Sequence, residues 1–583
     1  MYKVIEQKWD LESLYQVEFA EVLASLEAEV RNKRTALQNM PAPQTDQEIA
    51  AFKQTLEDIG RLDAEVNQAQ SYAMCWMSED TADRERAAVQ RRSSGLMGML
   101  KTLYIEVDRL LLLTDEAVIN DTFYLQERRK QASERLSPEL ETMLVEFAGN
   151  GAKSWSRMRQ AMVQRVRLTM NIGGEETTVS GGFAFQMLFT SHPDPALRKE
   201  LAVKLADALA PDAELYAMVL NQVIGLRMQT FQKRGWENPL HETLQVNRVS
   251  EATLQALCQA VERNLPRFVP YFEKQARLLG VERIGEEDVM APPGQKAVTA
   301  ISYEAGLELI LSHFERFSPV MADYVREAVA KRWIEADERL GKSNIIFCTQ
   351  LPVAKEQRVF TTFRGMYQCV SLLAHELGHA YHYHELSKQP PLAQKVPTSM
   401  AEIASTFSEL LLTNGYLSAL PDGPEKAAML GEKVRNTFQY LVKPYVNFLF
   451  EKRLCEVRKQ DVLSAAQLDE MMIDVQRGVY QDALAGYTPG HWISNNLFYL
   501  SERPFYNYQY MLGYLFSAGL YALGMEKGEL TAAQYADFLQ DTGCMNMEEL
   551  ARKHLGVDLT DERFWQQSLD VLVRDVEDYV KLG

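Results

Sequence analysis

Apolar residues recur at three- and four-residue spacings along most of this 583-residue chain, and this periodicity restricts the fold to a mainly α-helical one. Two regions break the pattern. Residues 166–170 and 177–179 alternate around a turn at 171–174, which predicts a β-hairpin. Residues 344–349 and 358–363 predict two further strands. The predicted helices cover residues 11–40, 46–80, 84–118, 122–150, 197–233, 250–280, 302–340 and most of 398–583.

The hairpin also suggests where to divide the chain. We expect a helical N-terminal domain over 1–195, with the hairpin near its end, and a second helical domain over 196–583. A chain of this length holds between two and four domains of ~150 residues, so two large domains are compatible with it.

Charge and hydropathy exclude several classes of protein. Asp and Glu total 80 against 62 Lys and Arg, and the formal charge of −18 repels nucleic-acid phosphates. The apolar fraction of 46% excludes a disordered chain, and no apolar run reaches the ~18 residues of a membrane span. The first residues lack a basic start followed by an apolar stretch. We therefore expect a cytoplasmic protein whose six scattered cysteines are reduced thiols.

Residues 375–379 read His-Glu-Leu-Gly-His, and this motif is where we expect chemistry. On an α-helix, His375 and His379 lie one turn apart on the same face, close enough to bind one tetrahedral zinc ion. Glu376 lies about 100° around the helix, where a base can take a proton from metal-bound water. Four of the nine histidines fall between residues 375 and 384, so a chance pair of packed histidines is a poor explanation.

A catalytic zinc site usually has three protein ligands, so a third is expected outside the motif. A metzincin would have Gly and His at the positions held here by His382 and Glu385, and this class is therefore excluded. A gluzincin takes a Glu from a following helix, and Glu402 stands 23 residues after His379. Small and apolar neighbours would make an unpaired carboxylate costly there. We predict one zinc ion bound by His375, His379 and Glu402, although cobalt or manganese would suit the same ligands.

At these residues the chain resembles oligoendopeptidase F and, more distantly, thimet oligopeptidase. The similarity covers residues 375–382 and 401–409 and continues nearly end to end, with further blocks at 9–14, 347–349, 361–365 and 504–510. The resemblance implies a large helical gluzincin-type peptidase with a small β-sheet beside the zinc helix and a deep substrate channel. It also implies zinc-dependent cleavage of internal bonds in short peptides, because such a channel excludes folded proteins.

Hydrolysis through a tetrahedral intermediate also requires donors to its oxyanion, and tyrosine keeps its proton at neutral pH. Four tyrosines lie in residues 504–514. We expect Tyr510 and then Tyr506 to be the catalytic donors, with aromatic packing as the alternative. The family pattern often has a His where this chain has Leu497, which cannot donate a hydrogen bond. Either His491 substitutes from nearby, or the transition state has one donor fewer.

Three further assignments follow from position. His382 shares the face of the two ligand histidines, where it either lines the site or is packed. Glu409 is a candidate hydrogen-bond partner of a ligand histidine, as zinc sites commonly require. The strand over 359–363, if it is an edge strand, could pair with an extended peptide.

The sequence therefore predicts a cytoplasmic zinc metalloendopeptidase that acts on oligopeptides, with no nucleic-acid or membrane partner and no oligomeric state specified. A gluzincin exopeptidase and a non-catalytic peptide-binding protein of the same fold are the alternatives. The intact ligands and Glu376 argue against the second alternative, for which Leu497 is the only support.

Overall fold

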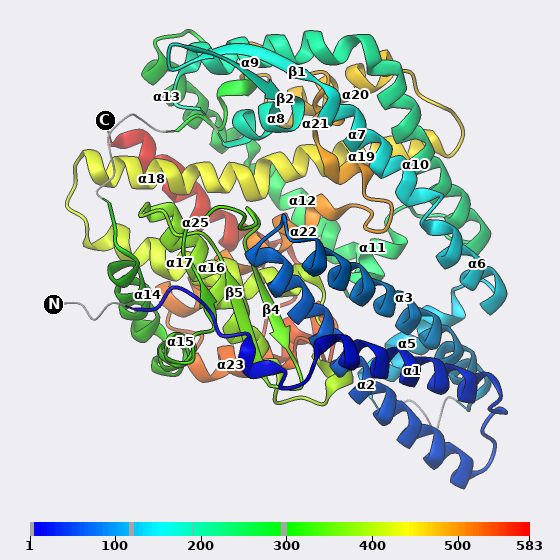
Figure 1. Cartoon of the computed structure of the whole chain (residues 1–583). Helices are drawn as coiled ribbons and strands as arrows, with labels where there is room; N and C mark the ends of the chain where they lie inside the picture. The colour runs from blue at the N-terminus through cyan, green and yellow to red at the C-terminus, as the bar shows by residue number, and fades with distance from the viewer. Residues whose placement is uncertain (1–4, 116–121, 191, 293–299, 583) are drawn as a thin grey trace. The chain divides into compact units, whose positions relative to one another are not determined.

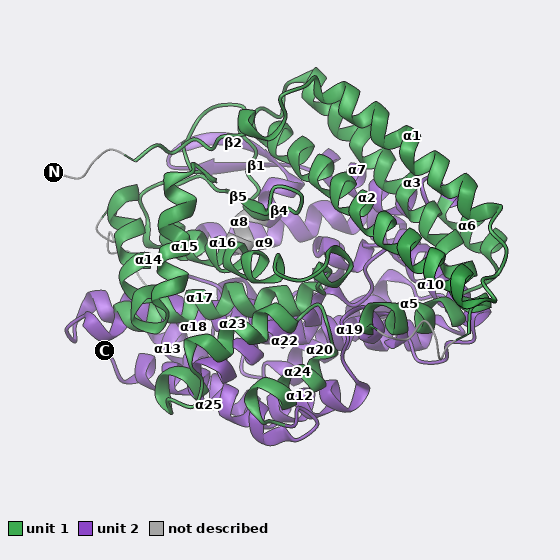
Figure 2. Cartoon of the chain, turned by 90° about the horizontal axis from the view of Figure 1, so that it is seen from below, with its two compact units in different colours: residues 1–145, 298–416, 523–557 green, residues 146–297, 417–522, 558–583 purple. Residues whose placement is uncertain are grey.

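The computed structural model describes residues 5–115, 122–190, 192–292 and 300–582, and of residues 186–190 it describes the backbone alone. Within these ranges the protein is mainly α-helical with two small β-sheets, as the periodicity predicts (Figure 1). The chain forms two compact units (Figure 2). Unit 1 comprises residues 1–145, 298–416 and 523–557, and unit 2 comprises residues 146–297, 417–522 and 558–583.

Each unit is assembled from three separate stretches of the chain. Neither unit coincides with the continuous domains 1–195 and 196–583, because helices that are distant in the sequence pack together within a unit. The division of the chain at residue 195 stays a prediction.

Unit 1 begins with long helices that pack along one another through their predicted apolar faces. Leu23 and Leu26 of the first helix and Leu96 and Leu100 of the third are buried in one core. The second helix starts at a capping box, in which the Thr45 side chain accepts the backbone N–H of Glu48. The helices of this unit are α1 (Phe19–Gln38), α2 (Asp46–Glu79), α3 (Arg84–Leu113), α5 (Phe123–Ser133), α6 (Pro138–Ala148), α14 (Tyr303–Phe317), α15 (Pro319–Ala330), α16 (Tyr367–Leu386), α17 (Thr398–Ala419), α23 (Ala532–Asp541) and α24 (Met547–Leu555), of which α6 and α17 end in residues of unit 2.

A three-stranded sheet lies within unit 1, in the order β3 (Ile334–Glu335), β5 (Glu356–Phe360), β4 (Phe347–Leu351). Strand β5 pairs in parallel with β3 and antiparallel with β4. The two strands expected from the sequence are therefore present, each displaced by a few residues. The sequence left open whether the second of them is an edge strand, and in the structure it is a central one, because β3 covers its outer side. With only two residues, β3 is too short to show a period-2 pattern.

Helix α16, which carries the motif, packs against β4 and β5, so the small sheet does lie beside it (Figure 1). The N-terminal segment covers the sheet on another side. The centroid of the Trp9 ring lies 5.3 Å from that of Phe360 and 6.5 Å from that of Phe347. The backbone N–H of Trp9 donates to the Glu335 carboxylate. Aromatic packing and this hydrogen bond hold the start of the chain on the strands next to the motif.

Unit 2 contains the predicted β-hairpin, formed by β1 (Arg167–Ile172) and β2 (Glu175–Ser180). Gly173 and Gly174 form its turn with φ of 65° and 93°, which a two-residue hairpin loop of this hand requires. The helices of unit 2 are α7 (Ala152–Arg165), α8 (Gly181–Thr190), α9 (Pro195–Leu209), α10 (Ala213–Arg234), α11 (His241–Val246), α12 (Glu251–Asn264), α13 (Val269–Leu279), α18 (Pro424–Thr437), α19 (Lys443–Arg458), α20 (Ala465–Val479), α21 (His491–Ser494), α22 (Tyr506–Tyr521) and α25 (Glu562–Lys581).

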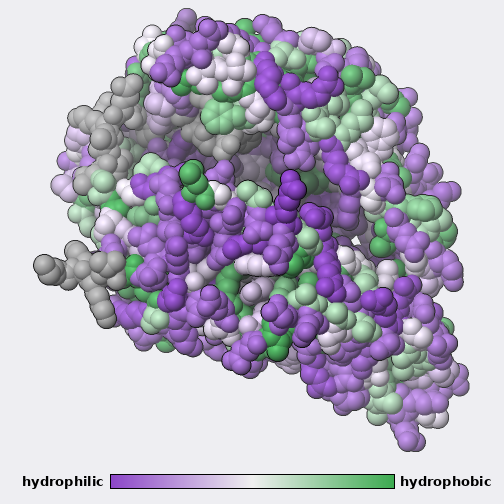
Figure 3. All heavy atoms as spheres, viewed as in Figure 1, coloured by the Kyte–Doolittle hydropathy of each residue, from purple (hydrophilic) through white to green (hydrophobic). Residues whose placement is uncertain are grey.

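The surface agrees with the composition. On the face shown in Figure 3, hydrophilic residues predominate and hydrophobic ones are scattered among them. Among the described residues, no helix combines the length and the hydropathy that crossing a membrane requires.

Candidate active site

Helix α16 presents the two histidines of the motif on one face. The helix follows Gly365, whose φ of 72° turns the chain out of the sheet, and it is anchored by Val370, Leu373 and Leu377, which are fully buried. Because these apolar side chains fix the rotation of the helix, the motif face is fixed as well.

Helix α17 brings Glu402 to the same place. The two helices approach closely at Gly378, where an added Cβ would lie 2.7 Å from the Ala404 carbonyl oxygen and 2.9 Å from Ser405 Cα. Residues around Glu402, including Ile403 and Ala404, are fully buried, as the sequence predicts. The Ser405 hydroxyl donates to a Glu402 carboxylate oxygen at 3.1 Å and orients it.

The three predicted ligands converge. One ligand atom from each of His375, His379 and Glu402 lies within 4.8 Å of the other two. The Glu402 Oε2 atom is 3.5 Å from His375 Nε2 and 3.7 Å from His379 Nε2. Ligands ~2.1 Å from a tetrahedral ion lie about 3.4 Å apart, so these separations suit a shared metal ion.

Glu409 lies further along α17 than Glu402 and contacts the opposite side of a ligand histidine. Its Oε1 lies 2.6 Å from His375 Nδ1, and its Oε2 accepts the Ser371 hydroxyl at 3.2 Å. This contact leaves Nε2 of His375 aimed at the cluster. Burial alone would lower the pKa of His375, but the hydrogen bond to Glu409 raises it to about 10. Burial lowers the pKa of His379 to about 3, so that ring is neutral in the metal-free protein, whereas His375 would release its proton on binding a metal ion.

Glu376 lies beside the ligands, and its side chain is 6% exposed. Burial raises its pKa to about 7. The nearby His375 lowers this pKa, and the Glu402 and Glu409 carboxylates raise it. The backbone N–H of Cys348 donates to the Glu376 carboxylate. In the metal-free protein the Glu376 carboxylate therefore holds its proton more tightly than a free glutamate does.

The Cys348 contact shows which edge of the sheet adjoins Glu376. The N–H groups of Val359 and Thr361 donate toward β3, at 2.9 and 2.8 Å. Phe360 therefore faces β4, where its partner is Phe347. Cys348 consequently points its N–H and C=O away from β5, on the side of β4 that no described strand covers. The edge strand next to the motif is therefore β4 and not β5, the second of the two strands predicted from the sequence.

The charge of this cluster fits a divalent cation. Glu376, Glu402 and Glu409 place three carboxylates in one largely buried site, and among the described residues no Lys or Arg forms an ion pair with them. Two imidazoles and a carboxylate are the donor set typical of zinc. The residues present therefore fit the metal that the sequence predicts.

His382 turns out to be a packed residue. Its side chain is fully buried, and its Nε2 lies 2.8 Å from the Thr542 hydroxyl. Burial lowers the pKa of His382 to about 3. Of the two roles that its position allowed, the structure supports packing against the segment after α23.

In unit 2, the four tyrosines near the start of α22 separate into two pairs. The Tyr508 hydroxyl donates to the Thr243 carbonyl at 3.1 Å, and the Tyr514 hydroxyl lies 3.1 Å from that of Thr437, both in buried surroundings. Tyr506 and Tyr510 are partly exposed, and their rings meet edge to face with centroids 5.4 Å apart. The first pair has structural hydrogen bonds, whereas Tyr510 and Tyr506 are the pair with access to solvent.

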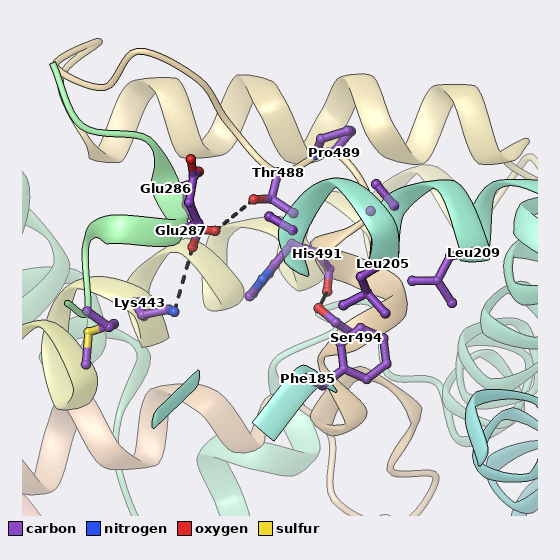
Figure 4. A pocket seen from close by; sticks show the side chains of 14 residues that line it. Phe185, Leu205, Leu209, Glu286, Glu287, Lys443, Thr488, Pro489, His491 and Ser494 are labelled. Carbon is purple, nitrogen blue, oxygen red and sulfur yellow. Dashed lines mark hydrogen bonds and ion pairs between the residues drawn. The ribbon is translucent and has the colours of Figure 1, made fainter. Parts of the chain in front are cut away.

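His491 is not a spare donor in place of Leu497. It is buried, its Nε2 lies 2.9 Å from Asn447 Oδ1, and burial lowers its pKa to about 4. It lines a cavity of about 100 Å³ inside unit 2 with Glu286 and Lys443 (Figure 4). The expectation that His491 substitutes for the missing family histidine therefore has no support from its contacts.

Two features of the site were not anticipated from the sequence. The close helix contact at Gly378 could have been inferred, because a glycine inside a helix lowers the stability of that helix and so indicates a packing reason. The contact between Cys348 and Glu376 could not, because it depends on the strand order of the sheet.

Comparison with known proteins agrees with this geometry. The chain matches the model of peptidase family M3 over residues 188–571, a span that includes the motif, Glu402 and the tyrosine segment. The chain belongs to peptidase family M3. The predicted relation to oligoendopeptidase F is confirmed by several relatives of this M3 peptidase.

It is 21% identical to oligopeptidase PepF of Bacillus subtilis over 79% of this chain and 68% of that protein. It is 21% identical to an oligoendopeptidase F homolog of Borreliella burgdorferi over 99% of this chain and 98% of that one. The crystal structure of oligoendopeptidase-F from Enterococcus faecium has a TM-score of 0.71 at 18% identity, with 97% and 99% of the two chains covered. PZ peptidase A in complex with an inhibitor has a TM-score of 0.74 at 16% identity and the same coverage. The mainly helical fold of the M3 peptidases is thereby confirmed.

Proposed function

We propose that this M3 peptidase is a zinc-dependent oligoendopeptidase, with one Zn²⁺ held by His375, His379 and Glu402. The observation that carries the proposal is the convergence of these three ligand atoms within 4.8 Å. The names of the relatives, which include oligopeptidase and oligoendopeptidase F, support short peptides as substrates. A cytoplasmic location belongs to the same proposal.

When bound, zinc polarises the scissile carbonyl and makes a water molecule more acidic. In this proposal Glu376 is the general base: its carboxylate accepts a proton from the attacking water and delivers it to the leaving amine. A divalent cation beside Glu376 lowers its pKa from the value in the metal-free protein, because positive charge favours the ionised carboxylate. Glu376 is then ionised at neutral pH.

Glu409 and Ser371 orient the site. The Glu409 carboxylate holds Nδ1 of His375, and the Ser371 hydroxyl holds Glu409 in turn. This chain of contacts fixes the ring plane and increases the basicity of the ligand nitrogen.

Tyr510, and after it Tyr506, would donate to the oxyanion of the tetrahedral intermediate. Their partial exposure supports this role, whereas Tyr508 and Tyr514 are buried. A neutral phenol supplies such a hydrogen bond without adding charge.

The outer edge of β4 would hold the peptide backbone. The Cys348 carbonyl and, two residues on, the main-chain groups of Gln350 face that side, while the Cys348 N–H contacts Glu376. Main-chain pairing is tolerant of the substrate's side chains, which suits an enzyme that acts on many peptides.

The test is digestion of an end-blocked peptide of about ten residues, with and without a chelator, read by mass spectrometry. We expect internal cleavage that chelation abolishes and zinc restores. Glu376→Gln should retain zinc and lose turnover at least 1000-fold, because the amide is not a base. Cleavage of unblocked peptides alone would favour an exopeptidase. Bound zinc without any cleavage would favour a peptide-binding protein, and near-normal turnover of Glu376→Gln would remove its proposed role.

A further inference from the structure

Two polar side chains on one face of α19 hold the segment that leads into α22. Asn447 and Glu451 lie one helical turn apart, and they are 6% and 0% exposed. Both contact residues at the start of α22, the helix that carries Tyr506 and Tyr510. A buried carboxylate in such a position requires an explanation, because burying a charge is costly unless it is paired.

Glu451 is paired with Arg227 of α10. Arg227 Nη1 donates to Glu451 Oε1 at 3.0 Å, and the same oxygen accepts the Phe505 N–H at 3.0 Å. Nη2 of Arg227 donates to the Leu500 carbonyl at 2.8 Å. The ion pair therefore contacts the backbone at both ends of the loop 500–505.

Phe505 has a backbone conformation that a side chain of this kind rarely adopts. Its φ of 55° is left-handed, and it is the residue immediately before Tyr506, the first residue of α22. A non-glycine residue keeps such a conformation only when its surroundings impose it. Two contacts of Phe505 can do so: its N–H donates to Glu451, and its buried ring packs against Phe448 with ring centroids 6.1 Å apart.

Asn447 holds the next residue but one. Its Nδ2 donates to Asn507 Oδ1 at 3.1 Å, while its Oδ1 lies 2.9 Å from His491 Nε2. Asn507 is 1% exposed. The contacts of α19 therefore fall on Phe505 and Asn507, on either side of Tyr506 and within one turn of Tyr510.

We propose that the Arg227–Glu451 pair is a positioning device that fixes the left-handed turn at Phe505 and thereby the direction of the Tyr506 and Tyr510 hydroxyls. The proposal rests on the proposed function, in which these tyrosines donate to the oxyanion. A role in stability alone is a weaker explanation, because an apolar pair of similar size often stabilises a buried site equally well. What an apolar pair cannot do is accept the Phe505 N–H.

The test variant is Arg227→Met combined with Glu451→Leu, which replaces the pair by apolar side chains. We expect a folded protein with normal zinc content, KM within twofold of the wild-type value, and kcat lowered at least tenfold, because a donor that acts in the transition state is displaced. Glu451→Gln keeps an oxygen for the Phe505 N–H and should retain kcat within threefold. An unchanged kcat in the double variant overturns the proposal.

A second comparison distinguishes positioning from a general loss of structure. In a background that carries both Tyr506→Phe and Tyr510→Phe, the same double substitution should lower kcat less than threefold further, since the groups it positions are already absent. A full additional tenfold loss would overturn the proposal. Arg198 and Asp288 form a control pair in unit 2, with Nη2 and Oδ1 2.7 Å apart and side chains 1% and 15% exposed. Arg198→Met with Asp288→Leu should leave kcat unchanged.

The double variant could fail to fold, and the wild type could bind zinc without cleaving peptides. If the double variant does not fold, Arg227→Lys replaces it: a single ammonium cannot hold both Glu451 and Leu500, so kcat should fall at least threefold at constant KM. An unchanged kcat in that variant also overturns the proposal. Wild-type protein that holds zinc but cleaves no peptide overturns the proposed function and this inference with it, whereas active wild type with active variants overturns this inference alone.

Discussion

Gly378→Ala should disrupt the metal site without touching any ligand. The substitution places a Cβ 2.5 Å from Ser408 Oγ, 2.7 Å from the Ala404 carbonyl oxygen and 2.9 Å from Ser405 Cα. The Ser408 hydroxyl can rotate away, but the other two atoms belong to the backbone of α17. The helix that carries Glu402 must therefore move.

The size of the movement follows from these distances. Ordinary carbon contacts begin at about 3.4 Å, so the α17 backbone must retreat by about 0.5–0.7 Å at Ala404 and Ser405. Metal–ligand distances tolerate about 0.2 Å, so Glu402 can no longer reach an ion centred on the two histidines without strain. We expect a loss of zinc affinity of about 10- to 100-fold and of about 1–3 kcal/mol in stability.

The assay is zinc affinity by competition with a chromophoric chelator, together with the thermal unfolding midpoint. Gly95→Ala is the matched control, because Gly95 lies in helix α3 of the same unit with nothing within 4 Å of its added Cβ. The control should bind zinc normally and be stabilised by up to ~1 kcal/mol. If Gly378→Ala binds zinc as tightly as this control, close approach of α16 and α17 does not define the site.

Three further predictions concern other residues. Glu409→Gln should weaken zinc binding about 10- to 100-fold, measured by the same competition, because His375 loses a charged partner; unchanged affinity would refute that support. Tyr510→Phe should lower kcat more than it raises KM in steady-state peptide cleavage, while Tyr508→Phe leaves kcat within about threefold; the reverse order would exchange their roles. Burial lowers the pKa of His491 from 6.5 to about 4. The stability that its neutral ring contributes is therefore fully present above pH 6.5 and is lost as the pH falls toward 4, because the unfolded chain takes up the proton first. Urea unfolding should show that wild type loses about 2 kcal/mol more than His491→Gln between pH 7 and pH 5, and equal losses would contradict this.

The helices illustrate how local patterns predict structure. The periodic stretch over 46–80 became a single helix, Asp46–Glu79, because its apolar face and its capping box agree. The stretch over 302–340 holds two of the expected helices, divided at Ser318 and Pro319, but its end is not helical. It contains β3, whose pairing partners at Val359 and Phe360 are about 25 residues away.

The candidate site shows the same distinction. The helical period placed His375 and His379 on one face, and the cost of an isolated carboxylate among apolar residues indicated Glu402. Glu409 was a candidate partner of one of the ligand histidines, and the 2.6 Å contact identifies that histidine as His375. The assignment of His382 to packing required knowledge of Thr542, 160 residues away.

The helical class, the hairpin, the His-Glu-Leu-Gly-His motif and the relation to oligoendopeptidase F were predictable from sequence, because each depends on residues within a turn or two of one another or on a linear pattern. The folded chain was needed to show that β4 is the edge strand beside Glu376, that His491 is buried and bonded, and that Glu451 contacts the turn before Tyr506. These features arise from contacts between segments far apart in the chain, and no local spacing specifies which of several polar side chains a fold will bring together.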